Sequence, residues 1–382
     1  MLLEIVPTRS DERALKSLKE NILRAVPTIK SLRVDSGKIY IEVEGFDLEA
    51  LSRIRGVKTI KYEEKTIKGF GGLPVGYSGK ALMMFSGGFD SPVASWLLWN
   101  SGFSLDFVHF NLAGPVQVYH MGVVLKELYT SWGRSDDSRL YIVDFRNVAR
   151  EIIELVDRRY KQIVLKRAMY KVSEMLAERI NIDVIATGES VGQVSSQTLH
   201  SLAAIEEALK EKIVLRPLAG LDKEEIINIS KRIGLYELSK NVGEYCALVA
   251  GKVVTRPKLQ KTLNEEKKIE KLLEESLESI EEYDLREFDP RRLLPYEDLE
   301  IDFVPYNAVL VDARSTISED VPGAIRMEEV NPEDLKDRVV VVFCEDGIIS
   351  REIALELRNQ GILAYSFRGG FKRLREKFCI VI

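Results

Sequence analysis

Residues 81–98 read ALMMFSGGFDSPVASWLL, and this stretch decides the expected fold of the middle of the chain. The apolar run ALMMF predicts a buried strand, and Pro92 fits the first turn of a helix that follows. Between them, Gly87 and Gly88 let the backbone approach an anion closely, next to the positive end of the helix dipole. A strand, a glycine turn and a helix in this order predict a phosphate-binding loop. The alternative is a glycine-rich turn that binds nothing.

The polar residues of the same loop indicate what it holds. Ser86 and Ser91 add hydroxyl donors to a phosphate cradle, whereas Asp90 would repel a phosphate. Asp90 is therefore expected to be a ligand of a Mg²⁺ ion that bridges the phosphates. The loop is not a Walker A motif, because no Gly-Lys-Ser/Thr follows it.

Beyond the loop, strand-like apolar runs alternate with helical stretches. The runs are LDFVHF (105–110), RLYIVDF (139–145), IDVIATG (182–188) and IVLRPL (213–218). This alternation is typical of a mostly parallel sheet that helices cover on both faces. We therefore expect an α/β domain over residues 69–261, which opens with the Gly-rich linker GFGGLPVGYSG.

The segments on either side predict further units. Residues 1–68 show the order β-α-β-β-α-β of a ferredoxin-like domain, although a generic small α/β domain is the alternative. Residues 262–302 are acidic, with an apolar stripe at helical spacing, and predict a charged helical linker. Residues 303–382 predict another α/β domain, in which the buried strand VVVVF leads directly into Cys344.

The composition excludes several classes of protein. With 45% hydrophobic and 30% charged residues, the chain is expected to be globular rather than disordered. No apolar run has membrane-spanning length, and the N-terminus is too charged for a signal peptide. Three dispersed cysteines argue against a disulfide scaffold and a CxxC zinc site. A cytoplasmic protein with reduced thiols is therefore expected.

The net charge of −5 conceals a segregated distribution. Residues 1–80 hold 15 Lys+Arg and 11 Asp+Glu, a balance of +4, whereas residues 262–302 hold 6 and 15, a balance of −9. The total argues weakly against a nucleic-acid partner, but the basic N-terminal end is where RNA would first be sought.

The motifs together resemble a known family. SGGFDS resembles the pyrophosphate loop of the ATP pyrophosphatase superfamily, whose members share an adenine-nucleotide alpha-hydrolase-like (PP-loop) fold. From Gly69 to the C-terminus, the blocks follow the order seen in the ThiI-type tRNA 4-thiouridine synthetases. The blocks are GFGGLPVG, VVLKELY, VLKRAMYKVSEMLAER, ATGESVGQVSSQTL, VLRPLAGLDKEEIINISKRIG and EYCAL. The block TGESVGQVSSQTL is the most specific, because no general rule of folding demands it.

The resemblance implies an ATP site, and two residues at the end of a neighbouring expected strand are added to it. Residues that match the family's ATP-binding positions are Met84, Phe85, Ser86, Gly87, Gly88, Asp90, Ser91, Lys166, Gly188 and Gln197. His109 and Phe110 end the next strand at the same expected sheet edge, where they would pack against adenine. Lys166 would supply positive charge for phosphates, the alternative being a solvated charge on a helix.

Cys344 is the second candidate for chemistry. A cysteine before a helix has backbone N–H groups directed at its sulfur, which stabilises an anionic sulfur; a buried structural cysteine is the alternative. The segments VLVDARS, VPGAIRM, CEDGIISREIALELRNQGI and FRGG resemble a short rhodanese domain. This implies that Cys344 accepts sulfur from a cysteine desulfurase or another persulfide donor. The match of EYC implies a disulfide between Cys246 and Cys344 during turnover, while Cys379 is expected to be structural.

The resemblance implies a function as well. The enzyme would use ATP and Mg²⁺ to adenylate O4 of a uridine in tRNA, and replace it with persulfide-derived sulfur to give 4-thiouridine. The family's RNA-binding THUMP domain is missing between the N-terminal unit and the linker. The alternative acceptor is therefore a sulfur-carrier protein for thiamine thiazole biosynthesis, and a third interpretation is a non-catalytic sulfur relay. The sequence leaves the oligomeric state open; a dimer would supply RNA surface in trans.

Overall fold

The computed structural model describes residues 1–45, 47–192, 198–240, 242, 254–295, 298–314 and 320–378. The chain divides into two compact units, Met1–Phe288 and Asp289–Ile382. The first unit contains two sheets and the second unit contains one.

The N-terminal part of the first unit is an antiparallel sheet with two helices. Its elements are β1 (Leu2–Pro7), α1 (Glu12–Ala25), β2 (Ile29–Asp35), β3 (Lys38–Val43), α2 (Leu48–Ser52), β4 (Val57–Tyr62) and β5 (Lys65–Lys68). The order β2-β3-β1-β4 is that of a ferredoxin-like sheet, and β5 adds a hairpin at the edge. Alternate residues such as Leu3, Ile5, Ile39 and Ile41 face α1 in one apolar core.

The larger part of the first unit is built on a six-stranded sheet. Its strands are β6 (Gly79–Met84), β7 (Phe103–Asn111), β8 (Arg139–Asp144), β9 (Val184–Thr187), β10 (Ile213–Leu215) and β11 (Glu281–Asp284), in the order β10-β9-β6-β7-β8-β11. All neighbouring pairs are parallel except β8 with β11. The expected α/β class with a mostly parallel sheet is therefore confirmed.

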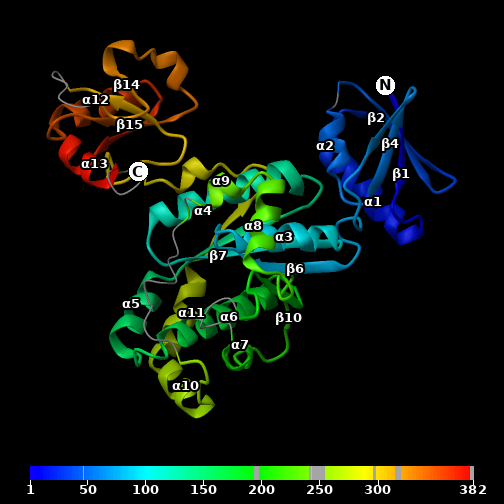
Figure 1. Ribbon diagram of the computed structural model, residues 1–382, viewed down its shortest axis with the longest axis horizontal. Coiled ribbons are helices and arrows are strands. Elements are labelled where there is room, and N and C mark those ends of the chain that lie inside the picture. The colour runs from blue at the N-terminus through cyan, green and yellow to red at the C-terminus, as the bar shows by residue number, and fades with distance from the viewer. Residues whose placement is uncertain are drawn as a thin grey trace. The chain divides into compact units, whose positions relative to one another are not determined.

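Helices cover both faces of this sheet, as Figure 1 shows. One face carries α3 (Asp90–Asn100), α4 (Pro115–Leu128) and α8 (Lys223–Arg232), and the other carries α5 (Arg146–Leu155), α6 (Lys161–Arg179) and α11 (Glu270–Glu278). Shorter helices are α7 (Leu199–Glu206), α9 (Tyr236–Ser239) and α10 (Leu259–Glu266), and a π-helical turn at Tyr129–Gly133 extends α4. Both faces are buried, which agrees with the continuous apolar runs in the sequence.

The acidic segment 262–302 does not form one connecting helix. Its first part is split into α10, a 3₁₀ turn and α11, and Ile269, Leu273 and Leu277 pack with α5 and α6 in the core. The chain then adds β11 to the sheet edge. The apolar stripe thus covers the sheet, and the division between the compact units falls after Phe288.

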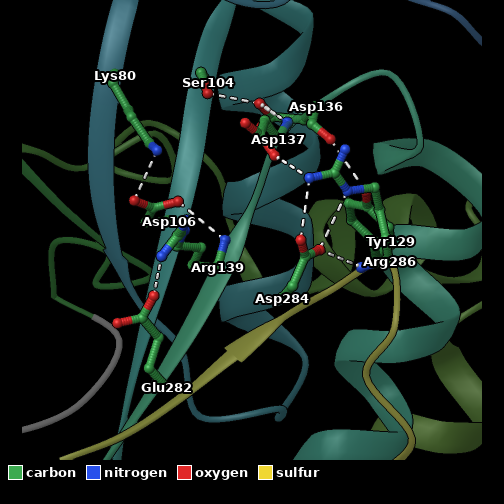
Figure 2. Close-up of polar contacts among 10 residues, drawn as sticks. All are labelled: Lys80, Ser104, Asp106, Tyr129, Asp136, Asp137, Arg139, Glu282, Asp284 and Arg286. Atoms are coloured by element: carbon green, nitrogen blue, oxygen red, sulfur yellow. Dashed lines mark hydrogen bonds and ion pairs between the residues drawn. The ribbon is translucent and has the colours of Figure 1, made fainter. Parts of the chain in front are cut away.

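Buried carboxylates fasten the amino-end edge of this sheet (Figure 2). Asp136 is 1% exposed and accepts hydrogen bonds from Trp99 Nε1, Leu105 N and Ser104 Oγ at 2.8, 2.8 and 2.6 Å. Asp106 pairs with Lys80 at 2.7 Å; burial raises the pKa of Asp106 although Lys80 opposes that shift. These carboxylates link strands β6 and β7 to the turn that precedes β8.

The second unit has an all-parallel five-stranded sheet. Its elements are β12 (Glu300–Ile301), β13 (Val309–Asp312), β14 (Ala324–Arg326), β15 (Val339–Phe343), α12 (Ile348–Asn359), β16 (Leu363–Phe367) and α13 (Gly370–Phe378). The strand order is β12-β16-β15-β13-β14, so β15 is central and fully buried. In the part of the chain that the structure describes, no helix has the length and apolar character needed to cross a bilayer.

The substitution Asp136→Asn tests the buried carboxylate. In the natural chain, the two carboxylate oxygens of Asp136 accept from these donors. The amide of the variant replaces one oxygen by an N–H₂ group, which faces a donor and leaves it without an acceptor. We therefore expect a loss of about 2 kcal/mol in unfolding free energy. Asp137→Asn is the matched control, because Asp137 pairs with Arg286 at an exposed position and should change stability by less than about 1 kcal/mol. Denaturant unfolding followed by tryptophan fluorescence reports this domain, since all three tryptophans lie in it. Equal losses in both variants would contradict the assignment.

Candidate functional site

The site lies where the strand order of the central sheet reverses. From β6 the chain proceeds to β7 and β8 on one side, and then returns to place β9 on the other side of β6. Met84 at the end of β6 pairs with Val108 of β7 and with Thr187 of β9. Because the loops after β6 and β9 leave the sheet in different directions, a crevice for a ligand is expected at their carboxyl ends.

The loop after β6 folds around the hydroxyl group of Ser91. Ser91 Oγ accepts hydrogen bonds from the backbone N–H groups of Ser86 and Gly87, both at 3.1 Å, and lies 3.3 Å from Ser86 Oγ. Phe89 stacks on Tyr236 with ring centroids 5.3 Å apart. Asp90 begins α3 and is half-buried. The six residues therefore form a compact turn at the helix N-terminus.

Glycine occupies three positions in this region, each for a different physical reason. Gly87 has φ +84°, and a Cβ there would lie 2.9 Å from Met121 Cα. A Cβ on Gly188, after β9, would lie 2.9 Å from the backbone nitrogen of Ser91. At Gly88 a Cβ would meet only Ser86 Oγ, at 3.8 Å, so protein packing does not require a glycine. Gly88 instead leaves open space over the loop, as a close-fitting ligand needs.

The remaining strand-end residues are mostly buried beneath the loop. Met84 is half-buried, and Phe85 packs edge-on against Phe107. His109 is 1% exposed, and its Nδ1 lies 2.9 Å from the carbonyl oxygen of Phe85. Burial lowers the pKa of His109 to about 4, so the imidazole is neutral at neutral pH and its Nδ1–H donates to Phe85. Phe110 is buried against the ring of Phe145.

Lys166 belongs to a charged cluster centred on Glu189. Lys166 Nζ lies 2.7 Å from Glu189 Oε1, and Tyr170 donates its hydroxyl to Glu189 Oε2 at 2.6 Å. Arg216 contacts the same carboxylate at 3.3 Å and also Glu206 at 2.6 Å. Burial alone would raise the pKa of Glu189, but Lys166 and its other partners outweigh burial and lower that pKa. A buried carboxylate thus fixes two cations just beyond the carboxyl end of β9.

Arg216 was missed by the sequence reasoning. It follows β10 immediately, in the quoted block VLRPLAGL, and the rule that ligands gather at the carboxyl ends of parallel strands could have identified it. Gln197 lies outside the described residues. Among the residues that are described, no three His, Cys, Asp or Glu side chains are grouped so as to hold a metal ion.

Cys344 follows the central strand of the second unit and is 2% exposed. Its sulfur accepts the backbone N–H groups of Gly347 and Ser350 at 3.2 and 3.3 Å. The sulfur also lies 3.4 Å from Ser350 Oγ and 3.6 Å from Asp346 Oδ1. The start of α12 thus directs two backbone donors at the sulfur, while the Asp346 carboxylate lies where it can accept the thiol proton.

The FRGG segment packs against the backbone of the same loop. Gly370 has φ +62°, and a Cβ there would lie 2.5 Å from the carbonyl oxygen of Glu345. The backbone N–H of Phe371 donates to the carbonyl oxygen of Cys344 at 2.8 Å. The other two cysteines, Cys246 and Cys379, lie outside the described residues.

The substitution Glu189→Gln tests the charged cluster. Removing the carboxylate leaves Lys166 and Arg216 largely buried without it, so we expect a loss of about 3 kcal/mol in unfolding free energy. Glu206→Gln is the control, because Glu206 is exposed and its pair with Arg216 should contribute less than about 1 kcal/mol.

The same comparison has a predicted pH dependence. Because the folded-state pKa of Glu189 lies below the ordinary value of 4.5, its contribution is fully present above pH 4.5 and is lost as the pH falls through the folded-state pKa. The stability difference between the natural chain and Glu189→Gln should therefore shrink only in acid. Denaturant unfolding at a series of pH values measures it, and a difference that grows in acid would contradict the assignment.

Comparison with known proteins gives a consistent family. The family model described as thiamine biosynthesis protein (ThiI) matches residues 76–271. The tRNA sulfurtransferase of Desulfurococcus amylolyticus is 38% identical over 341 residues, which is 88% of this chain and 70% of that relative. That of Pyrobaculum aerophilum is 37% identical over 343 residues, which is 86% of this chain and 69% of that relative.

The fold agrees with these matches. A crystal structure of a 4-thiouridine synthetase–RNA complex with bound ATP has a TM-score of 0.67 at 23% identity, and the match covers 74% of this chain and 98% of that one. At this identity the likeness concerns the fold. The family model spans more than half of the chain and the relatives share more than a third of their aligned residues, so the chain belongs to the ThiI family of tRNA sulfurtransferases.

Proposed function

We propose that this chain is an ATP-dependent tRNA sulfurtransferase that converts a uridine of tRNA to 4-thiouridine. Relatives named tRNA sulfurtransferases support the activity, and the bound ATP and RNA of the similar fold support the substrates. The observation that carries the proposal is the loop at residues 86–91. It lies at the reversal of strand order, and Gly88 leaves open space there that packing does not explain.

The loop supplies binding groups for the phosphates of ATP. The N-terminus of α3 adds its partial positive charge, and Lys166 and Arg216 add fixed charge beside the crevice. Asp90 is the carboxylate of the loop, and one carboxylate with phosphate oxygens and waters is a donor set that suits Mg²⁺. When bound, Mg²⁺ would neutralise phosphate charge.

The proposed chemistry has two stages. O4 of uridine attacks the α-phosphorus of ATP, the bond to the β-phosphate oxygen breaks, and pyrophosphate leaves. The outer sulfur of a persulfide on Cys344 then attacks C4, and AMP leaves with the oxygen. Finally the Cys246 thiolate attacks Cys344 Sγ, so the electron pair of the broken S–S bond stays on the transferred sulfur. The resulting disulfide requires a dithiol reductant, and a cysteine desulfurase or another persulfide donor reloads Cys344.

A sulfur-carrier protein is the second candidate acceptor, and one observation favours it. β5 ends at Lys68, and Gly69 already bonds to Lys58 while Phe70 packs on Trp132 with ring centroids 4.8 Å apart. This short connection supports the interpretation that no THUMP domain lies between the N-terminal sheet and the linker. Adenylation of a C-terminal carboxylate would use the same loop.

Exchange of label between pyrophosphate and ATP tests the adenylation step. Exchange stimulated by tRNA supports the main proposal, whereas exchange stimulated only by a carrier protein supports the alternative, and no exchange with either refutes both. Gly88→Ala should reduce exchange by at least about tenfold without lowering the melting temperature, because its Cβ fills ligand space only. Gly87→Ala should lower the melting temperature as well, since its Cβ meets Met121. Unimpaired exchange in Gly88→Ala would exclude the proposed cradle.

Serine substitutions of the three cysteines test the sulfur stage. Cys344→Ser should abolish 4-thiouridine formation, measured by mass spectrometry of tRNA nucleosides, while exchange of pyrophosphate with ATP persists. Cys246→Ser should allow a single turnover and block repeated turnover, because the disulfide cannot close. Cys379→Ser is the control and should behave as the natural chain does. If Cys246→Ser sustains full multi-turnover transfer, its resolving role is wrong.

A further inference from the structure

Within the first unit, a group of arginines and tryptophans lies between the N-terminal sheet and the part built on the six-stranded sheet. Arg55, in the turn before β4, is fully buried, with its guanidinium 4.6 Å from the ring centroid of Trp96 and 5.3 Å from that of Trp132. Arg53 lies over Trp132 at 5.2 Å, and Arg232 lies over Trp96 at 5.0 Å. Three guanidinium groups therefore share two indole rings.

The buried donors of this group lack acceptors. Among the described residues, no hydrogen-bond acceptor lies in reach of Arg55 Nε and Nη2, Arg53 Nε or Trp96 Nε1, although all four atoms are shielded from solvent. Arg55 Nη1 has only a long contact, of 3.5 Å, with Asn100 Oδ1. Buried donors are normally satisfied, and a cluster of orphans of one polarity indicates a missing acceptor.

The charges of the group are equally unbalanced. Within the described part of the chain, no carboxylate forms an ion pair with Arg55, Arg134 or Arg232, and Arg53 pairs only with the exposed Glu49 at 2.6 Å. Burial and the nearby charge of Arg232 lower the pKa of Arg55 to about 9. An isolated buried cation of this kind is costly unless a negative charge accompanies it.

An accessible pocket reaches this group at Arg53 and Trp132, while Arg55 lies behind the ring of Trp132 and does not line it. Its lining includes Arg53, Thr130, Ser131, Trp132, Arg134 and Ser135. The hydroxyl of Ser135 is buried and has no partner among the described residues, while Arg134 is exposed. The pocket therefore offers guanidinium and hydroxyl donors to a small anionic group that enters from solvent.

We propose that this pocket binds a phosphate group of the RNA backbone. Arginine is suited to phosphate because its planar fork donates two parallel hydrogen bonds. Half-buried Arg53 and exposed Arg134 line the pocket, and exposed Arg232 shares the ring of Trp96 with Arg55. The N-terminal sheet belongs to the basic end of the chain, with a balance of +4 over residues 1–80. The choice of RNA rests on the proposed function; the shared chemistry is the phosphate group, which a free phosphate ion also provides.

The test measures tRNA affinity at several salt concentrations for the intact chain. Arg134→Glu should weaken binding by roughly tenfold and reduce the slope of log K against log salt by about 1, as the loss of one phosphate contact requires. Arg158→Glu is the matched control, because Arg158 is an exposed arginine outside the pocket with the same change of charge. Equal losses in the two variants would show a general effect of charge and overturn the site.

Arg55→Met separates binding from structure. Replacing a buried cation that lacks an anion by an apolar side chain should raise the melting temperature, yet it should weaken tRNA binding. A purely structural arginine would show a lowered melting temperature and unchanged affinity, and that result would overturn the proposal.

A measurement with inorganic phosphate shows whether the pocket binds RNA phosphate or free phosphate. It also separates a failure of the pocket proposal from a failure of the proposed function. If tRNA does not bind the natural chain, the proposed function fails; the pocket then stands only if phosphate raises the melting temperature of the natural chain and not of Arg134→Glu. If tRNA binds the natural chain and Arg134→Glu equally, the RNA site is refuted, whatever phosphate does.

Discussion

The pairing of β6 with β9 is the contact on which the candidate site depends. It brings together two loops that are about a hundred residues apart in sequence, at the carboxyl ends of neighbouring parallel strands. The approach is so close that only glycine fits at position 188, because a Cβ there would collide with the backbone of Ser91. The loop geometry, the hydroxyl of Ser91 and the cations around Glu189 are all positioned by this one register.

Two buried charges in the first unit differ in how far their neighbours compensate them. Glu189 is buried but receives Lys166, Arg216 and the hydroxyl of Tyr170, so its charge is fully compensated. Arg55 is buried and receives two indole faces and no carboxylate among the described residues. A satisfied network rigidifies its surroundings, whereas a buried polar group without a partner is costly. The contrast separates a compensated carboxylate next to β9 from a buried cation whose charge no carboxylate of the described residues balances.

The second unit has the same arrangement of a parallel strand, a turn and a helix N-terminus, but with different side chains at the turn. Cys344 also follows a central parallel strand and precedes a helix, but the first turn of that helix directs its N–H groups at a thiol. In the first unit the corresponding turn has glycines and open space, which suits a phosphate ester. Because helix N-termini carry partial positive charge, both turns favour anionic groups, and the side chains decide which one.

The sequence by itself determined the parallel α/β domain, the loop at residues 86–91 and the placement of Cys344 before a helix, because strand periodicity, glycine and short motifs are local signals. It did not predict that residues 262–284 pack on the sheet, since a charged amphipathic segment looks the same whether its stripe faces a linker or a core. Nor did it show Arg216 on Glu189 or Arg55 between two tryptophans. Only the tertiary structure decided these, because burial and charge compensation depend on residues that are distant in sequence and meet only when the sheet and its helices have assembled.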